Sequence, residues 1–109
     1  MPKAGHILNI LEDRGTIQHF SATATADVKT PSSGKALRIL AFFYYCTADI
    51  TTELRFKTSG NVIGGLSAKG AAGMNLVGRK PPQGSADEVV EIYLSGTGTA
   101  KGWICYEEI

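Results

Sequence analysis

The clearest pattern of hydrophobic and polar positions lies between Lys35 and Thr58. Its second half alternates strictly, which is typical of a β-strand with one dry and one wet face. Its first half is apolar on both faces, as expected of a central strand that is covered on each side. A short turn at 47–49 separates the halves, so the pattern predicts a hairpin of two long strands. The dry face of the second strand holds Ile50, Thr52, Leu54, Phe56 and Thr58, and the wet face holds Thr51, Glu53, Arg55 and Lys57.

Simple alternation along the first strand divides its side chains between two sides. Both sides are apolar for most of their length, as expected of a strand with another layer packed over each side. One side holds Leu37, Ile39, Ala41, Phe43 and Tyr45, and the other holds Leu40, Phe42 and Tyr44.

The rest of the chain is divided by turn residues into further short strands that would cover this hairpin. Two adjacent glycines, Gly64 and Gly65, predict a bulge or a bend inside one of them. We therefore expect an all-β protein, an antiparallel β-sandwich of seven or eight strands with jelly-roll or Greek-key connections. The additional strands are expected at Thr16–Phe20, Ser21–Thr30, Val62–Leu66, Met74–Val77, Glu88–Leu94 and Thr99–Glu107. Alternation in the last two predicts that each has one face turned to the core, made of Val90, Ile92 and Leu94 in one strand and of Ala100, Gly102, Ile104 and Tyr106 in the other.

The first 20 residues are expected to form an arm, with the sandwich domain at 21–109. The arm is apolar at four positions, and these side chains must be buried either on the chain's own domain or on a neighbouring chain. On the second alternative the arm adds to the sheet edge of a partner. The four positions are Ile7, Leu8, Ile10 and Leu11.

Length and charge limit the number of domains and the classes of partner. A chain of 109 residues is one domain. A net charge of +1 argues against nucleic acid as a partner, because proteins that bind it concentrate a basic surplus. Neither a signal peptide nor an apolar run long enough to cross a membrane is recognisable, so synthesis in the cytoplasm and no membrane partner are expected.

The residue types that perform catalysis or bind metals do not have the sequence spacing that either role requires. Cys46 and Cys105 lie inside apolar strand patterns, which favours buried small hydrophobes, with a disulfide between them as the alternative. Neither cysteine has the spacing of a zinc site. The Gly64–Gly70 segment lacks the order of a phosphate-binding loop, and His19 has no nucleophile nearby in sequence. No catalytic residue, metal or cofactor is therefore expected.

Two groups of side chains are candidates for binding. Tyr44, Tyr93 and Trp103 fall on the faces that we interpret as wetter, where aromatic rings can stack on sugars or anchor a protein. The basic residues Arg79 and Lys80 lie in a loop and can contact an acidic partner surface. Burial under a second layer and simple solvation are the respective alternatives.

The second half of the chain resembles a group of viral proteins. The pattern runs through Leu54-Arg55-Phe56, Val62-Ile63-Gly64, Ala68 to Leu76 and Val90 to Gly98, and ends near Tyr106. Over about residues 35–109 it is similar to small β-sandwich virion proteins of tailed bacteriophages, including capsid decoration (cement) proteins. This resemblance implies a non-catalytic protein on the outer surface of the virion, often trimeric, that binds the major capsid protein or another virion protein.

A different class of function is a carbohydrate- or receptor-binding module of a phage fibre or tail. It predicts that Tyr44, Tyr93 or Trp103 are exposed together on one sheet face. A small enzyme, which would need a cleft with a titrating residue of shifted pKa, is the third class.

Overall fold

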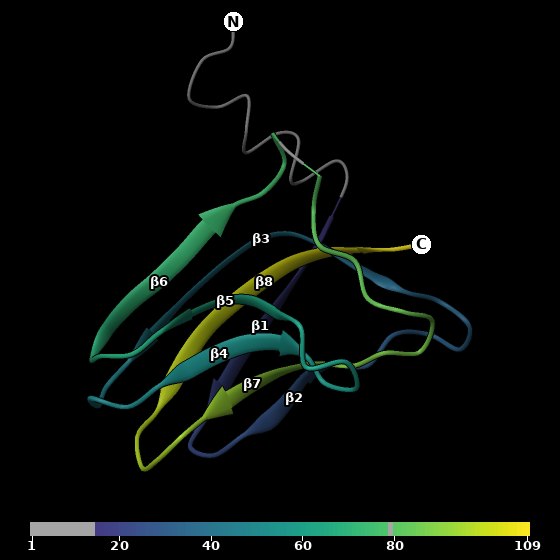
Figure 1. The fold of residues 1–109 in the computed structure, drawn as a ribbon. Helices are drawn as coiled ribbons and strands as arrows, with labels where there is room; N and C mark the ends of the chain where they lie inside the picture. Colours follow the sequence, from purple (N-terminus) through teal and green to yellow (C-terminus); the bar gives the residue numbers. More distant parts are fainter. Residues whose placement is uncertain (1–14, 79) are drawn as a thin grey trace, which may run out of the picture.

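The computed structural model describes residues 15–78 and 80–109. Within these residues, eight strands make up two four-stranded antiparallel sheets, which confirms the predicted all-β sandwich (Figure 1). The strands are β1 (Thr16–Ala22), β2 (Ala26–Lys29), β3 (Leu37–Cys46), β4 (Thr52–Phe56), β5 (Val62–Leu66), β6 (Gly70–Asn75), β7 (Val90–Leu94) and β8 (Ala100–Glu108).

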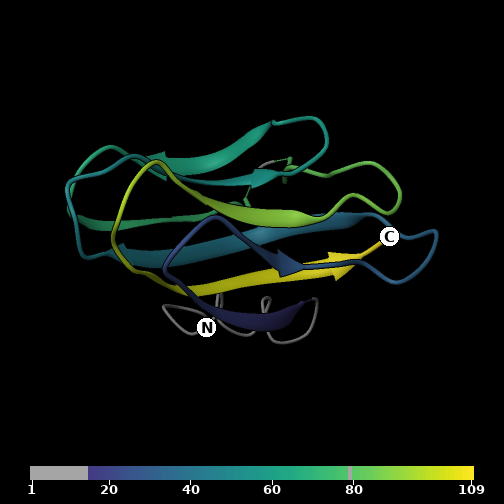
Figure 2. The same ribbon diagram turned by 90° about the horizontal axis from the view of Figure 1, so that it is seen from below.

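The strand order shows a jelly roll. One sheet has the order β1-β8-β3-β6 and the other β2-β7-β4-β5. The first strand pairs with the last, the second with the seventh, the third with the sixth and the fourth with the fifth. The chain is thus one long antiparallel ribbon, folded back at β4–β5 and rolled into two layers. In Figure 2 the purple β1 lies beside the yellow β8, and β8 beside the blue β3.

The hairpin predicted from residues 35–58 is wrong in its pairing, although both strands exist. β3 pairs with β6 on one edge and β8 on the other, whereas β4 belongs to the second sheet. The turn after Cys46 therefore carries the chain from one layer to the other. Both edges of β3 are already occupied, so β4 can only pack across from it, face to face.

The core lies between the two sheets and follows the predicted faces for most strands. In β4, Thr52, Leu54 and Phe56 point inward, and Glu53 and Arg55 point outward, as expected. β7 and β8 likewise alternate as predicted. The inward-facing residues of these two strands include Val90, Ile92, Leu94, Ala100, Ile104 and Tyr106.

Along β3 the predicted alternation fails halfway. The register with β8 shifts between Ile39 and Ala41, so one extra residue is accommodated there as a bulge. Before the bulge Ile39 points into the core, and after it Phe42 and Tyr44 do. A slip of one residue moves every later side chain to the other face. Strict alternation therefore grouped the side chains wrongly.

The paired glycines of β5 do mark a bulge, as predicted. Leu54 pairs with Gly64 but Arg55 pairs with Val62, which leaves Ile63 as the extra residue. A Cβ on Gly64 would collide with the ring of Phe42 from the opposite sheet. The missing side chain at Gly64 thus makes room for an aromatic residue in the centre of the core.

Several strand boundaries differ from the sequence-based expectation. The strand expected at Thr16–Phe20 is present and continues to Ala22, so it is the edge strand of a sheet. The single strand expected at Ser21–Thr30 is wrong, because a turn at 23–25 separates β1 from β2. The strand expected at Met74–Val77 begins four residues earlier, since Ala and Gly at 70–73 pair with β3 despite their low β-propensity.

Both cysteines are buried thiols, and the alternative of a disulfide is wrong. Cys46 is at the end of β3 opposite Ala100, while Cys105 is opposite Ala41, near the middle of the same ladder. Cys46 lies at an inward-facing position and Cys105 belongs to a separate apolar cluster on the outer side of the sheet. The pairing register thus holds them apart along the strands and on opposite faces.

Candidate functional site

The outer face of the β1-β8-β3-β6 sheet is a regular array of side chains. Because antiparallel partners project on the same side, the pairing register gives three outward-facing rows across the four strands. We call this surface the outer face. Its rows are Ile17–Cys105–Ala41–Asn75, His19–Trp103–Phe43–Gly73 and Ser21–Lys101–Tyr45–Ala71.

Large apolar side chains of the outer face are open to solvent. Ile17 is 46% exposed, Phe43 44% and Tyr45 43%. One end of the face carries a second apolar cluster, separate from the inter-sheet core, in which Val77 and Trp103 pack on Leu40, Ala41 and Cys105. The sheet therefore has apolar residues on both sides, whereas a sandwich that only needs its own core has them on one side.

The outer face of the other sheet has the opposite character. Arg55 Nε donates to the carboxylate of Glu91 at 2.7 Å, and Lys57 Nζ lies 3.0 Å from Asp27 Oδ1. The Arg55 guanidinium also lies 4.3 Å from the centre of the Tyr93 ring. The hydrogen bond to Glu91 raises the pKa of Arg55, so the guanidinium stays charged. These side chains satisfy one another, which suits a surface facing water.

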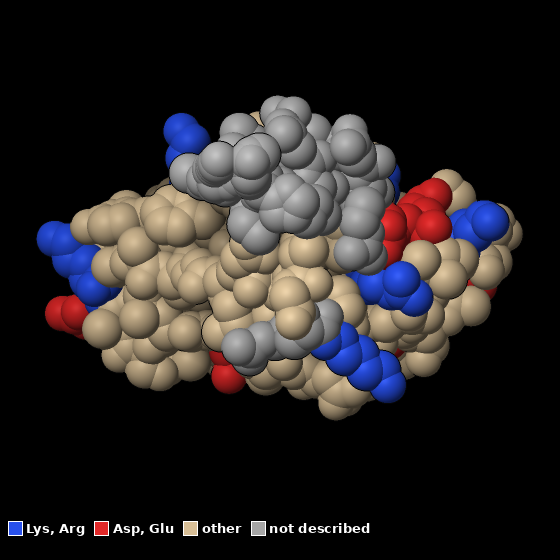
Figure 3. Space-filling view, turned by 90° about the horizontal axis from the view of Figure 1, so that it is seen from above, with Lys and Arg blue, Asp and Glu red and all other residues tan. Residues whose placement is uncertain are grey.

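Charged side chains do not gather into one field in the view of Figure 3. Among the described residues in this view, blue and red groups lie apart from one another, with tan side chains between some of them. The described residues on this face thus form no continuous basic surface of the kind that binds a polyanion.

A shallow hollow opens on the outer face above β6. Its volume is about 540 Å³. Ala71 and Gly73 form its floor, because small side chains leave space above the edge strand, and Phe43 and Trp103 form an aromatic wall. A Cβ on Gly73 would lie 3.0 Å from Cδ1 of Phe43, so the glycine allows this ring to lie low over the strand.

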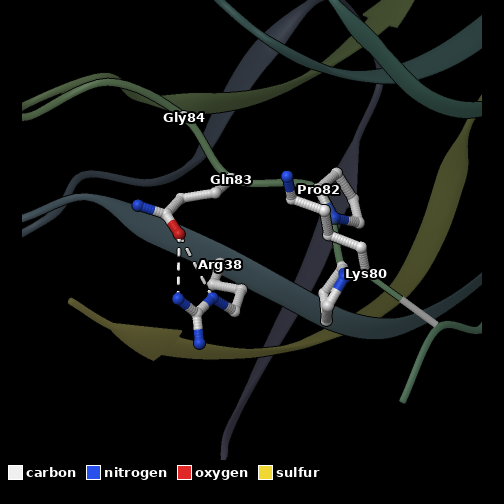
Figure 4. Close-up of a pocket in the computed structure, with 6 residues that line it drawn as sticks. Arg38, Lys80, Pro82, Gln83 and Gly84 are labelled. Carbon is white, nitrogen blue, oxygen red and sulfur yellow. Dashed lines mark hydrogen bonds between the residues drawn. The ribbon is translucent and has the colours of Figure 1, made fainter. Parts of the chain in front are cut away.

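A second hollow lies beside the 80–84 loop, with Arg38, Lys80, Pro82 and Gln83 on its lining (Figure 4). Nε and Nη2 of Arg38 donate to Gln83 Oε1, at 3.2 and 3.0 Å, and Nη1 bonds Glu107 Oε1 at 3.1 Å. Each nitrogen of the guanidinium is thus already engaged in holding the loop to β3 and β8.

The carboxylate of Glu88 joins two loops at the end of the second sheet. It accepts hydrogen bonds from the backbone N–H of Ser59 at 2.6 Å and of Ser85 at 3.0 Å. Burial opposes its charge, but these hydrogen bonds outweigh burial and lower the pKa of Glu88. Glu88 therefore stays ionised as a structural residue between β4–β5 and the segment before β7.

The predicted binding residues lie in different parts of the molecule. Tyr44 was expected on a wetter face and is instead buried in the core, because the β3 bulge reverses its side. Tyr93 lies under Arg55 on the charged face, and Trp103 is partly buried on the outer face. The three aromatic residues are not exposed together, so the arrangement expected of a glycan-binding module is wrong.

The remaining predicted residues divide between a loop and the chain start. Lys80 is exposed beside the hollow of Figure 4. Arg79 lies outside the described residues, as do four apolar residues of the arm. These are Ile7, Leu8, Ile10 and Leu11.

The aromatic residues Phe43 and Tyr45 are exposed, although their exposure was not predicted from the sequence. Both were placed on one side of the first strand, opposite Tyr44, and this part of the interpretation is correct. The unrecognised step was which side faces water. Lys101, opposite Tyr45 in the ladder, was a possible signal, because cross-strand partners share a face.

Comparison with known families and curated proteins identifies no relative of the chain. No protein-family model matches the chain, and no curated protein is similar to it in sequence. Within residues 15–78 and 80–109, no group of three His, Cys, Asp or Glu side chains is placed to hold a metal ion. In the same part of the chain there is no helix of the length and apolarity needed to cross a membrane.

Proposed function

We propose that this chain is a non-catalytic structural protein of a bacteriophage particle, a capsid decoration protein that binds the outer capsid surface and stabilises the particle. The difference between the two outer faces carries this proposal. One face carries the Arg55–Glu91 and Lys57–Asp27 ion pairs, and Val62 is its exposed large apolar residue among the described residues. The other face presents Ile17, Phe43 and Tyr45 to solvent. Exposed apolar patches with aromatic residues are typical of protein contact surfaces.

The jelly roll is compatible with this role but does not select it, because viral capsid proteins and lectins both use the fold. The pattern shared with small phage virion proteins over residues 35–109 supports the capsid role. The partner on this proposal is the major capsid protein or another virion protein. The proposed trimer is tested by light scattering, and a strict monomer at high concentration would contradict it.

Attachment is tested by adding the purified protein to particles that lack it and measuring cosedimentation. Replacing Ile17 and Tyr45 by serine removes two exposed anchors from the outer face without touching the inter-sheet core. We expect binding to fall at least about tenfold, which corresponds to about 1.4 kcal/mol. The matched control is Tyr93→Ser, the same change on the charged face, which should bind like the wild type.

Two results would overturn the proposal. Purified particles from the encoding phage that do not contain this chain would exclude a virion role. Equal cosedimentation of the Ile17/Tyr45 variant and the wild type would exclude the outer face as the contact. Binding to a glycan array that depends on Tyr45 would instead assign the chain to the carbohydrate-binding class.

A further inference from the structure

The chain enters the sandwich by crossing the outer face. Residue 16 is the first that pairs with β8, and Gly15 already lies against that face. A Cβ on Gly15 would collide with Sγ of Cys105 and lie 3.1 Å from Cδ1 of Leu40. Glycine is required at this position because the backbone passes so close to the sheet. The preceding residues therefore start from a point above β8, at its border with β3.

From Gly15 the hollow above β6 is the adjacent surface. Ala41, which belongs to the same cluster as Leu40 and Cys105, also lines the hollow, so the entry point and the hollow are contiguous. β8 and β6 are two strand spacings apart, about 10 Å. Four extended residues span about 13 Å. Leu11, four residues before Gly15, is thus within reach of the floor of the hollow.

We infer that the hollow above β6 is the binding site of the chain's own residues 7–11, Ile-Leu-Asn-Ile-Leu. The hollow and the segment 7–11 are chemically complementary. The hollow offers an aromatic wall of Phe43 and Trp103 and a floor of Ala71 and Gly73, and none of the described residues that line it is charged. The segment offers four branched aliphatic side chains and no charge.

The short connection favours the segment of the same molecule over that of a second copy. A tether of a few residues holds the aliphatic side chains at a local concentration in the millimolar range. A neighbouring molecule reaches that concentration only when the protein itself does. The site is therefore filled in the isolated monomer, and this inference holds whichever partner binds the rest of the outer face.

Trp103 makes this inference measurable, because it is the only tryptophan of the chain and forms part of the wall. In the full-length chain, Leu8→Asp combined with Ile10→Asp places two charges on the segment. We expect the fluorescence emission of Trp103 to shift to longer wavelength and its quenching by acrylamide to increase. The matched control adds the same two charges outside the segment, as Thr23→Asp combined with Ala24→Asp in the exposed turn between β1 and β2, and should leave both signals near those of the wild type.

A second variant tests the site from its other side. Ala71→Arg fills the hollow from an exposed position of the edge strand and should change Trp103 fluorescence in the same direction. Its control is Ala68→Arg, in the exposed turn before β6. Circular dichroism shows whether each variant retains the sheet structure.

Three outcomes would overturn the inference. One is Trp103 emission and quenching that are the same in the wild type and in the Leu8/Ile10 and Ala71 variants. Another is a wild-type signal that changes on dilution, which would assign the hollow to the segment of a second copy. The third is loss of the sheet signal in the Leu8/Ile10 variant, which would place the segment in the inter-sheet core. All measurements use the isolated protein, so their failure and a failure of capsid attachment are independent.

Discussion

Tyr44 connects the two sheets, and removing its hydroxyl tests whether it is a structural residue. Its Oη lies 2.9 Å from Thr52 Oγ1 and 3.2 Å from the Thr52 carbonyl oxygen, across the core from β3 to β4. Both residues are fully buried, so water cannot replace the hydroxyl. In Tyr44→Phe, Thr52 Oγ1 retains only its longer contact with the Leu66 carbonyl, at 3.4 Å.

The expected loss in the free energy of unfolding follows from this geometry. Loss of one buried hydrogen bond with a partner left weakly satisfied destabilises a protein by about 1–2 kcal/mol. For a domain of this size that lowers Tm by about 4–8 °C. Thr52→Val should cost a similar amount, since the Tyr44 hydroxyl retains the Thr52 carbonyl as an acceptor. The double variant should lose less than the two single losses together, because it leaves neither hydroxyl unpaired.

The assay is urea unfolding of the four proteins, followed by circular dichroism and by the fluorescence of Trp103. The midpoints should decrease at constant slope, which shows that stability and not the unfolded state has changed. A Tyr44→Phe variant as stable as the wild type, or strictly additive losses, would refute the structural role. A variant that keeps its stability but no longer binds particles would instead support the original interpretation of Tyr44 as a surface residue.

Two further predictions concern other parts of the sandwich. Glu88→Gln should lower the free energy of unfolding by roughly 1–3 kcal/mol at pH 7. Because the pKa of Glu88 is lowered in the fold, its contribution to stability is present above the unfolded pKa, about 4.3, and is lost as pH falls through the folded pKa. The urea-unfolding curves of the variant and the wild type should therefore converge in acid. A wild-type advantage that persists undiminished in acid would contradict this. Gly102→Ala should destabilise the protein by roughly 3 kcal/mol, since its Cβ would meet the Phe43 carbonyl and lie 2.5 Å from the Tyr44 Cα. Gly78→Ala, with no atom within 4 Å of its Cβ, should leave thermal unfolding unchanged. Similar Tm values for the two variants would contradict the close approach of β3 and β8.

The binding surface was less predictable than the fold, and Phe43 and Tyr44 show why. Their side chains are alike in size and apolar character, and only their positions after the bulge send one to solvent and the other to the core. A bulge depends on how two strands distant in sequence pair, because the extra residue is defined only relative to the partner strand. The resulting surface depends on the same pairing, since Phe43 and Trp103 are 60 residues apart in the chain and become neighbours only through the β3–β8 ladder.

By itself the sequence determined the fold class and the inward faces of β4, β7 and β8, because alternation and turn residues act over a few neighbouring positions. It also located the bulge of β5, since paired glycines inside a strand have a local meaning. Tertiary structure alone decided that β3 and β4 lie in different sheets and which aromatic residues face solvent. Both depend on pairing between distant strands, and every strand of an antiparallel protein offers two edges to many alternative partners.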